Sequence, residues 1–421
     1  MRVPTGKFSN DLIWSAGAFA LGAFFGILVN VAIVRGYDAA ALGVFNLVYA
    51  VYILMSQLAV GGVHLAVQAF VPREIAARRN PDTYVTASML LSTLSSMVVI
   101  AIGWAFRDLP GDWFNSHAVR DAFPLVLPGL LFFSWNKVLL SYHNGARRMK
   151  LFALMQMLRF VFLFSSVTYL AWTEAPVSRL PLALFWSEVA LFALVLPLSL
   201  RHWDPLHRTG LGPVIRENWH YGNRALAGNF LLDVNTRVDV FLLGLFTNET
   251  SIGLYSFAST IAEGVLQLPV LFRNNINPVL SRAWHAGGPQ LLGKVIGRNR
   301  RRFFNLLAPL ILLSAVVFPA GLWVLGMDEE PMTVWALYTI LAVGIAVTSG
   351  YQAFQMLFGQ VGHPGTQTLF IAGFFLSNLL LNLLLIPLLG VYGSALGTAL
   401  AFVAMTILLR VLSWRVLQVR M

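Results

Sequence analysis

The sequence contains no cysteine and very little charge. None of its 421 residues is Cys, and only 11% are Asp, Glu, Lys or Arg, against about 25% in soluble globular domains. Without thiols the chain can form no disulfide framework, no thiolate metal site and no Cys nucleophile. It also lacks a Walker loop, a nucleophile elbow and histidines at metal-ligand spacing. These absences argue against a soluble enzyme, an ATP-driven pump and a metalloprotein.

The chain is rich in apolar residues. They make up 57% of the chain, and the mean hydropathy is +0.71. A helix that crosses a bilayer needs about 20 mostly apolar residues, and strands of a membrane barrel would alternate in polarity, which these stretches do not. The sequence therefore predicts an all-α polytopic membrane protein with about twelve transmembrane helices. Their predicted limits are 12–34, 42–70, 83–106, 122–142, 151–173, 181–200, 223–246, 251–275, 302–326, 333–358, 366–388 and 392–415.

The cations in the loops predict the orientation, because positively charged loops favour the cytoplasmic side. With the N-terminus inside, the loop and terminal cations divide 21 to 4, and the outer loops also carry acids such as Asp108, Asp112 and Asp328. We expect a multi-pass protein with both termini in the cytoplasm. The four outer cations are Arg35, Arg107, Arg120 and Arg179.

A polar segment at the midpoint indicates duplication. Residues 201–222 form a predicted cytoplasmic linker between an N-terminal six-helix lobe, 1–200, and a C-terminal six-helix lobe, 223–421. Similar short motifs recur at Val29–Val31 and Val238–Val240, and Gly43 and Gly253 each come near the start of the next predicted helix. Parallel halves related by a pseudo-two-fold axis along the membrane normal are a transporter architecture, with the ligand site between the lobes.

Three motifs resemble the polysaccharide-biosynthesis (Wzx-type) oligosaccharide flippases, bacterial members of the multidrug/oligosaccharidyl-lipid/polysaccharide exporter superfamily. The motifs are Val31–Arg35 with Ala41–Phe45, Asn235–Asp239 with Ile252–Tyr255, and Leu385–Ala395. The resemblance implies a flippase in the bacterial inner membrane that moves a polyprenyl-pyrophosphate-linked oligosaccharide from the cytoplasmic to the outer leaflet. It implies the lipid-linked oligosaccharide and membrane lipids as partners, with a polysaccharide polymerase or assembly protein as a further candidate, and no nucleic acid.

Four cations fall inside the predicted spans, where each buried charge is a functional candidate because hydrocarbon penalises it. Arg237 and Arg159 lie well inside their helices and are the first choices for contact with a pyrophosphate, which the guanidinium fork suits. Lys137 and Arg273 lie nearer the cytoplasmic interface and can snorkel. Asn229, Asp233 and Arg237 recur every four residues and predict one polar stripe. A pairing of Arg237 with Asp233 that only neutralises this stripe remains an alternative.

Four acids inside the spans are candidates to carry a coupling H⁺ or Na⁺, and each is equally a candidate counter-ion. They are Glu263, Asp239, Asp233 and Glu188, with Glu263 preferred because no cation lies within one turn of it. No other cofactor is expected. Candidate sugar contacts are Asn229, Asn235, Asn30 and Gln156, although hydrogen-bonded contacts between helices are the commoner use of such side chains.

Three functions remain open. The leading one is the oligosaccharide flippase, working by alternating access and without catalytic residues. A cation-coupled multidrug exporter of the same superfamily would have an apolar or net negative cavity. A glycan-processing enzyme is third, because the longest outer loop, about residues 107–121, is too short to form a catalytic domain.

Overall fold

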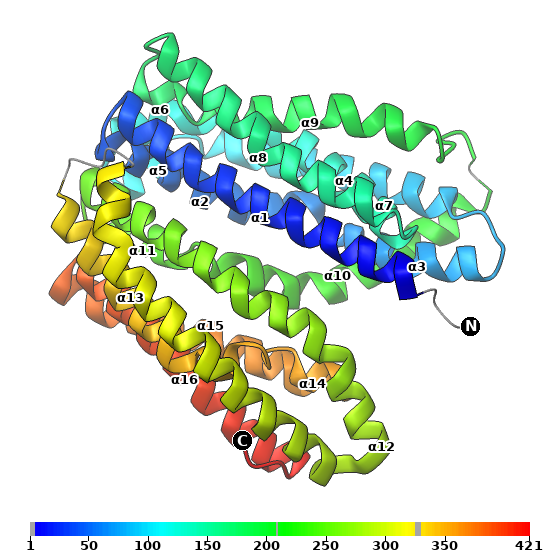
Figure 1. Cartoon of the computed structure of the whole chain (residues 1–421). Coiled ribbons are helices and arrows are strands. Elements are labelled where there is room, and N and C mark those ends of the chain that lie inside the picture. The colour runs from blue at the N-terminus through cyan, green and yellow to red at the C-terminus, as the bar shows by residue number, and fades with distance from the viewer. Residues whose placement is uncertain (1–4, 208, 325–329) are drawn as a thin grey trace. The chain divides into compact units, whose positions relative to one another are not determined.

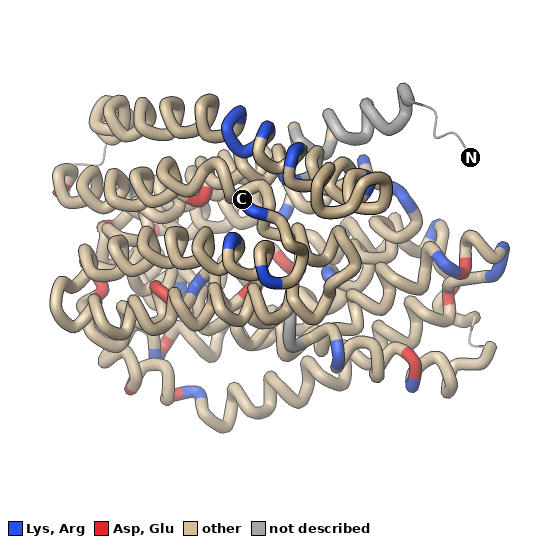
Figure 2. The backbone as a smooth tube through the Cα atoms, turned by 90° about the horizontal axis from the view of Figure 1, so that it is seen from below, with Lys and Arg blue, Asp and Glu red and all other residues tan. Residues whose placement is uncertain are grey.

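The computed structural model describes residues 5–207, 209–324 and 330–421 (Figure 1). The chain is 87% helical, and the described residues contain no strand. Eight of the described helices are long and apolar enough to cross a membrane, or nine if the bent pair α6 and α7 counts as one span. Most of the tube in Figure 2 carries neither charge colour. The chain is therefore an all-α polytopic membrane protein, as predicted.

The helices divide between two compact units. Unit 1 consists of Met1–Tyr37 and Val44–Val234, and unit 2 of Asp38–Gly43 and Asn235–Met421. In chain order the elements up to the midpoint are α1 (Thr5–Gly36), α2 (Ala39–Val60), α3 (Val63–Ala76), α4 (Asp82–Ala105), α5 (Leu109–Trp113), α6 (His117–Val126), α7 (Gly129–Gly145), α8 (Met149–Trp172), the 3-10 turn η1 (Val177–Arg179) and α9 (Leu182–Leu200). They are followed by α10 (Leu211–Asn235), α11 (Val238–Phe246), α12 (Glu249–Val324), α13 (Pro331–Gln352), α14 (Leu357–Gln360), α15 (Pro364–Leu389) and α16 (Val391–Leu417).

The predicted apolar stretches are helical in the described residues, but several are broken. The stretch 42–70 ends one helix at Val60 and begins the next at Val63, because Gly61 and Gly62 have φ of 62° and 70°. A Cβ on Gly62 would lie 2.4 Å from the carbonyl oxygen of Gly222 on α10. Only glycine therefore allows α10 to pass at this distance. The stretch 122–142 bends by 50° between α6 and α7.

One predicted span in the second half is also wrong. The stretch 223–246 is divided, since α10 ends at Asn235 and α11 begins at Val238. The stretches 251–275 and 302–326, the latter as far as Val324, lie on two helical segments of α12 that meet at a kink at Gly287 and Gly288. Gly288 has φ of 55°, which glycine adopts at little cost. The polar residues between the two stretches are thus helical on both sides of this kink.

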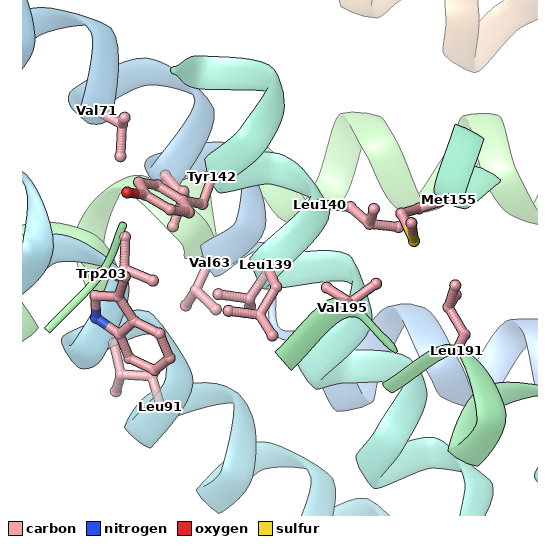
Figure 3. Packing of buried hydrophobic residues seen from close by; sticks show 13 residues of the cluster. Val63, Val71, Leu91, Leu139, Leu140, Tyr142, Met155, Leu191, Val195 and Trp203 are labelled. Carbon is pink, nitrogen blue, oxygen red and sulfur yellow. The ribbon is translucent and has the colours of Figure 1, made fainter. Parts of the chain in front are cut away.

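The polar segment at the midpoint is folded onto unit 1. Trp203 belongs to a buried cluster with residues of α3, α4, α7, α8 and α9, shown in Figure 3. Its indole Nε1 donates to Thr86 Oγ1 at 3.1 Å. Tyr142 OH donates to the carbonyl oxygen of His202 at 2.5 Å. Half of the predicted linker 201–222 is helical, because α10 begins at Leu211.

A charged network fixes the start of α10 to α3 and α4. The guanidinium of Arg73 lies 3.1 Å from Glu217 Oε1 and 3.0 Å from Glu74 Oε1. Tyr84 OH donates to Glu217 Oε2 at 2.7 Å, and Arg79 pairs with Glu74 Oε2 at 2.6 Å. Hydrogen bonding to Arg79 holds the pKa of Glu74 below its ordinary value. Partial burial alone would raise the pKa of Glu217, but hydrogen bonds from Tyr84 and Arg73 outweigh it and lower that pKa.

We expect acid to weaken this network. Because the folded pKa values of Glu74 and Glu217 are depressed, their ion pairs stabilise the fold fully above the ordinary value of 4.5. That stabilisation is lost as the pH falls below 4.5 through the folded pKa values. Thermal unfolding of the purified protein between pH 3 and pH 7 (roughly the range over which these carboxyls titrate) should show the loss. Glu74→Gln should make the unfolding temperature depend less on pH in the acidic range. An unchanged pH dependence would contradict the assignment.

Two glycines bring the starts of α2 and α12 into backbone contact within unit 2. A Cβ on Gly43 would lie 1.9 Å from the carbonyl oxygen of Glu249. A Cβ on Gly253 would lie 1.8 Å from the carbonyl oxygen of Ala39. The contact is reciprocal, since each glycine meets the carbonyl four residues before the other.

Candidate functional site

The eight intramembrane charges fall into two balanced sets. Each unit holds two of these predicted cations and two of the predicted acids, so the formal charges of the selected residues cancel within each unit. Unit 1 contains Lys137, Arg159, Asp233 and Glu188, and unit 2 contains Arg237, Arg273, Asp239 and Glu263.

Lys137 on α7 pairs with Asp233 on α10. Its Nζ lies 3.3 Å from Asp233 Oδ2 and donates to Gln57 Oε1, on α2, at 2.8 Å. The side chains of Lys137 and Asp233 keep 24% and 36% of their surface exposed. The pair is therefore accessible, and a ligand that reached it could replace the carboxylate.

Arg159 on α8 makes a more enclosed pair with Glu188 on α9. Arg159 Nε lies 3.0 Å from Glu188 Oε1, and Nη2 lies 3.4 Å from Oε2. Asn136 Nδ2 donates to Glu188 Oε2 at 2.8 Å and to its backbone oxygen at 2.9 Å. The Glu188 side chain is only 5% exposed. A carboxylate held by two partners in this way serves best as a permanent counter-ion.

One aromatic ring joins these two pairs. The centroid of Phe133 lies 5.0 Å from Arg159 Cζ and 5.5 Å from Lys137 Nζ. The ring faces both cations within the range of cation–π attraction. Phe133 was absent from the predicted site, although it lies four residues before Lys137 and so on the same face of α7. We call Phe133, Lys137, Arg159, Asp233 and Glu188 the unit 1 charge cluster.

In unit 2, Arg237 pairs with Glu263 across two helices. Arg237 precedes α11, and its Nη2 lies 3.5 Å from Glu263 Oε2 on α12. Glu263 was preferred as a coupling site because no cation lies within one turn of it in the chain, and the structure places Arg237, which is distant in sequence, beside it. The predicted stripe of Asn229, Asp233 and Arg237 does not continue to Arg237 on one helix, because α10 ends at Asn235. The side chain of Asn229 lies outside the described part of the structure.

Asp239 differs from the other three acids. Its Oδ2 accepts a hydrogen bond from Tyr255 OH at 2.5 Å, and Tyr255 OH lies 3.4 Å from Thr398 Oγ1. Each of the other acids has a cation within 4.0 Å, whereas among the described side chains Asp239 has none within that distance. Of the four acids, Asp239 is therefore the one whose described hydrogen bonds come from neutral donors alone.

The remaining predicted residues are not members of the ion pairs described above. Arg273 donates from Nη1 to Gln355 Oε1 at 3.2 Å. Asn235, at the end of α10, accepts from Asn378 Nδ2 at 3.2 Å, which is a contact between helices. Asn30 donates back to Gly26 on its own helix. Gln156 lies on α8, three residues before Arg159 and so on a neighbouring position of the same face.

This arrangement can recognise an anion inside the membrane. In Lys137–Asp233 and Arg237–Glu263, each cation is neutralised by an acid whose side chain is 36% or 42% exposed. An anionic ligand that displaced the carboxylate would find the cation already in place. Among the described residues, no group of three His, Asp or Glu side chains could hold a metal ion.

Comparison with known proteins gives the class first. The fold matches a lipid II flippase, MurJ, in an inward closed conformation, at TM-score 0.76 and 14% identity, covering 94% of this chain and 86% of that one. It also matches an inward-facing multidrug resistance MATE family transporter of the MOP superfamily, at TM-score 0.75 and 14% identity, covering 92% of each chain. A MOP superfamily transporter from Pyrococcus furiosus Vc1 matches at TM-score 0.63 and 13% identity, covering 96% of each chain. The fold is therefore that of MOP-type transporters.

The family follows from the sequence itself. The profile described as polysaccharide biosynthesis protein matches residues 9–284, about two thirds of the chain. The chain belongs to this family of polysaccharide biosynthesis proteins. No curated protein matches the sequence.

Proposed function

We propose that the protein is a flippase for a polyprenyl-pyrophosphate-linked oligosaccharide. It would move this lipid from the cytoplasmic to the outer leaflet of a bacterial inner membrane, for the synthesis of a surface polysaccharide. Family membership supports the pathway. The observation that carries the choice of an anionic substrate is that Lys137, on α7, and Arg237, between α10 and α11, each lie beside a partly exposed carboxylate.

The orientation in this proposal rests on the loop cations. Both termini would lie in the cytoplasm, because 21 loop and terminal cations fall on that side and four on the other. The lipid-linked oligosaccharide, membrane lipids and polysaccharide assembly proteins would be the partners. Alternating access would expose the site to one side of the membrane at a time.

Competition between the pyrophosphate and the carboxylates for the same cations would allow the site to bind and release its substrate. A pyrophosphate competes with Asp233 for Lys137 and with Glu263 for Arg237, since both ligands offer anionic oxygens to the same donors. Binding of H⁺ or Na⁺ to the displaced carboxylate would favour the substrate-bound state. Asp239 is a separate candidate for a coupling ion, because among the described residues no cation lies within 4.0 Å of its carboxylate.

Complementation of a deletion strain tests the proposal. Loss of the gene should leave undecaprenyl-linked repeat units facing the cytoplasm and remove the surface polysaccharide. Wild-type protein and the exposed outer-loop variant Arg179→Gln should restore it. Arg237→Gln should restore about a tenth or less, because one charge-assisted pair is worth about 1.5–3 kcal/mol. Normal polysaccharide together with drug sensitivity in the deletion strain would instead indicate a multidrug exporter.

A further inference from the structure

The cations of unit 2 that follow Glu263 have few acidic residues near them in sequence. After Glu263, the chain has no acid until Asp328, and after Glu330 it has none to its end. The acids at 328–330 come after Val324 in the chain. The helix from Arg302 to Val324 is about 33 Å long, at 1.5 Å per residue. Unit 1 is different, because Glu74 and Glu217 there neutralise Arg73 and Arg79.

Four of these cations share one face of α12. Lys294, Arg298, Arg301 and Arg302 follow a spacing of three and four residues, and all four are exposed. Ile296, on the other side of the helix, is buried in unit 2. Within the described residues, none of the four cations forms an ion pair. We call these four residues the α12 basic face.

The helix that carries this face is held in place. Arg300 points away from it and donates from Nη1 to Tyr351 OH, on α13, at 2.9 Å. A Cβ on Gly350 would lie 3.0 Å from the carbonyl oxygen of Arg300, so α12 and α13 are in close contact there. Two further exposed cations are Arg415, in the last turn of α16, and Arg420, which follows this helix. Val419, next to Arg420, packs near Gly293. The cations are thus arranged before any ligand arrives.

Exposed apolar side chains border the basic face. Leu291 is 39% exposed, Phe304 44% and Leu306 55%. Cations next to exposed apolar side chains, on a helix that leads into a membrane span, place the face at the boundary between hydrocarbon and water. Phosphate groups of lipids lie at that depth.

We propose that the α12 basic face binds the phosphate headgroups of anionic phospholipids, independently of the transported substrate. A topology signal needs cations on this side of the membrane but does not need acids to be absent, since acids contribute little to the positive-inside rule. The topology signal therefore does not explain why acidic residues are missing near these cations. Lipid phosphates that act as the counter-ions do explain it.

The test measures lipid binding to the purified full-length protein in neutral detergent. Fluorescent phosphatidylglycerol should bind more tightly than phosphatidylcholine, and added salt should weaken the binding. The triple variant Arg298→Gln/Arg301→Gln/Arg302→Gln should bind at least about tenfold more weakly, because each cation near a lipid surface contributes on the order of a fivefold change. The matched control Arg78→Gln/Arg201→Gln/Arg216→Gln removes three exposed cations of unit 1 and should change the affinity little.

Three results would overturn the proposal. Equal losses in the two triple variants would mean that net charge alone attracts the lipid. Equal binding of phosphatidylcholine would exclude recognition of an anion. Binding of undecaprenyl pyrophosphate but not of phosphatidylglycerol would assign the face to the substrate. The variant Arg298→Lys/Arg301→Lys/Arg302→Lys controls for folding, because it keeps the charges and should retain binding. Flipping by the glutamine triple variant in phosphatidylcholine vesicles reports separately on the proposed function.

Discussion

Replacing Glu188 by leucine is expected to lower the free energy of unfolding by about 3–5 kcal/mol, the usual cost of removing one partner from a buried ion pair. Glu188 is 5% exposed and accepts from both Arg159 and Asn136. Its loss would leave the guanidinium of Arg159 inside an apolar span without a counter-ion. Thermal or chemical unfolding of the purified protein in detergent measures the effect.

The double variant Glu188→Leu/Arg159→Leu is the matched control. It removes both charges and should recover most of the stability, because well-packed apolar side chains replace buried pairs at little cost. It also separates the two roles of Arg159. A stable double variant that no longer flips the lipid would place Arg159 in contact with substrate, whereas one that flips normally would make the pair structural. A single variant as stable as the wild type would contradict the burial of this pair.

The sequence predicted the helical architecture because helical spans are a local property. Leu369–Leu389 is apolar on nearly every face, and such a stretch reads as a span wherever it occurs. The breaks were not predictable in the same way. The chain has 34 glycines, and nothing local distinguishes Gly62 from the others. What selects it is the approach of Gly222 from α10, 160 residues later in the chain.

The charges of the candidate site were identified, but several of their partners were not. Residues four apart in a helix are neighbours, and this rule suggested an ion pair between Arg237 and Asp233. The structure pairs Arg237 with Glu263, which is 26 positions away, because α10 ends between the two predicted partners. Phe133 was missed for another reason. The chain has 31 Phe, and nothing in the sequence distinguishes Phe133 from the others. Only the structure shows that two cations lie against its ring.

The substitution Gly253→Ala is expected to separate the starts of α2 and α12. The new Cβ would lie 1.8 Å from the carbonyl oxygen of Ala39, and such contacts do not fall below 3.0 Å in real structures. The two backbones would have to move apart by about 1 Å or more in a densely packed region. We expect a loss of about 1–3 kcal/mol or more in the free energy of unfolding, together with loss of flipping in reconstituted vesicles.

Gly297→Ala provides the control on the same helix. Gly297 lies in α12 with nothing within 4 Å of its would-be Cβ. Alanine there should stabilise the helix by up to about 1 kcal/mol, since glycine is the poorer helix former. Gly43→Ala should reproduce the effect of Gly253→Ala, because its Cβ would meet Glu249 in the same way. If Gly253→Ala and Gly297→Ala were equally stable, the reciprocal glycine contact would not exist in the membrane-embedded protein.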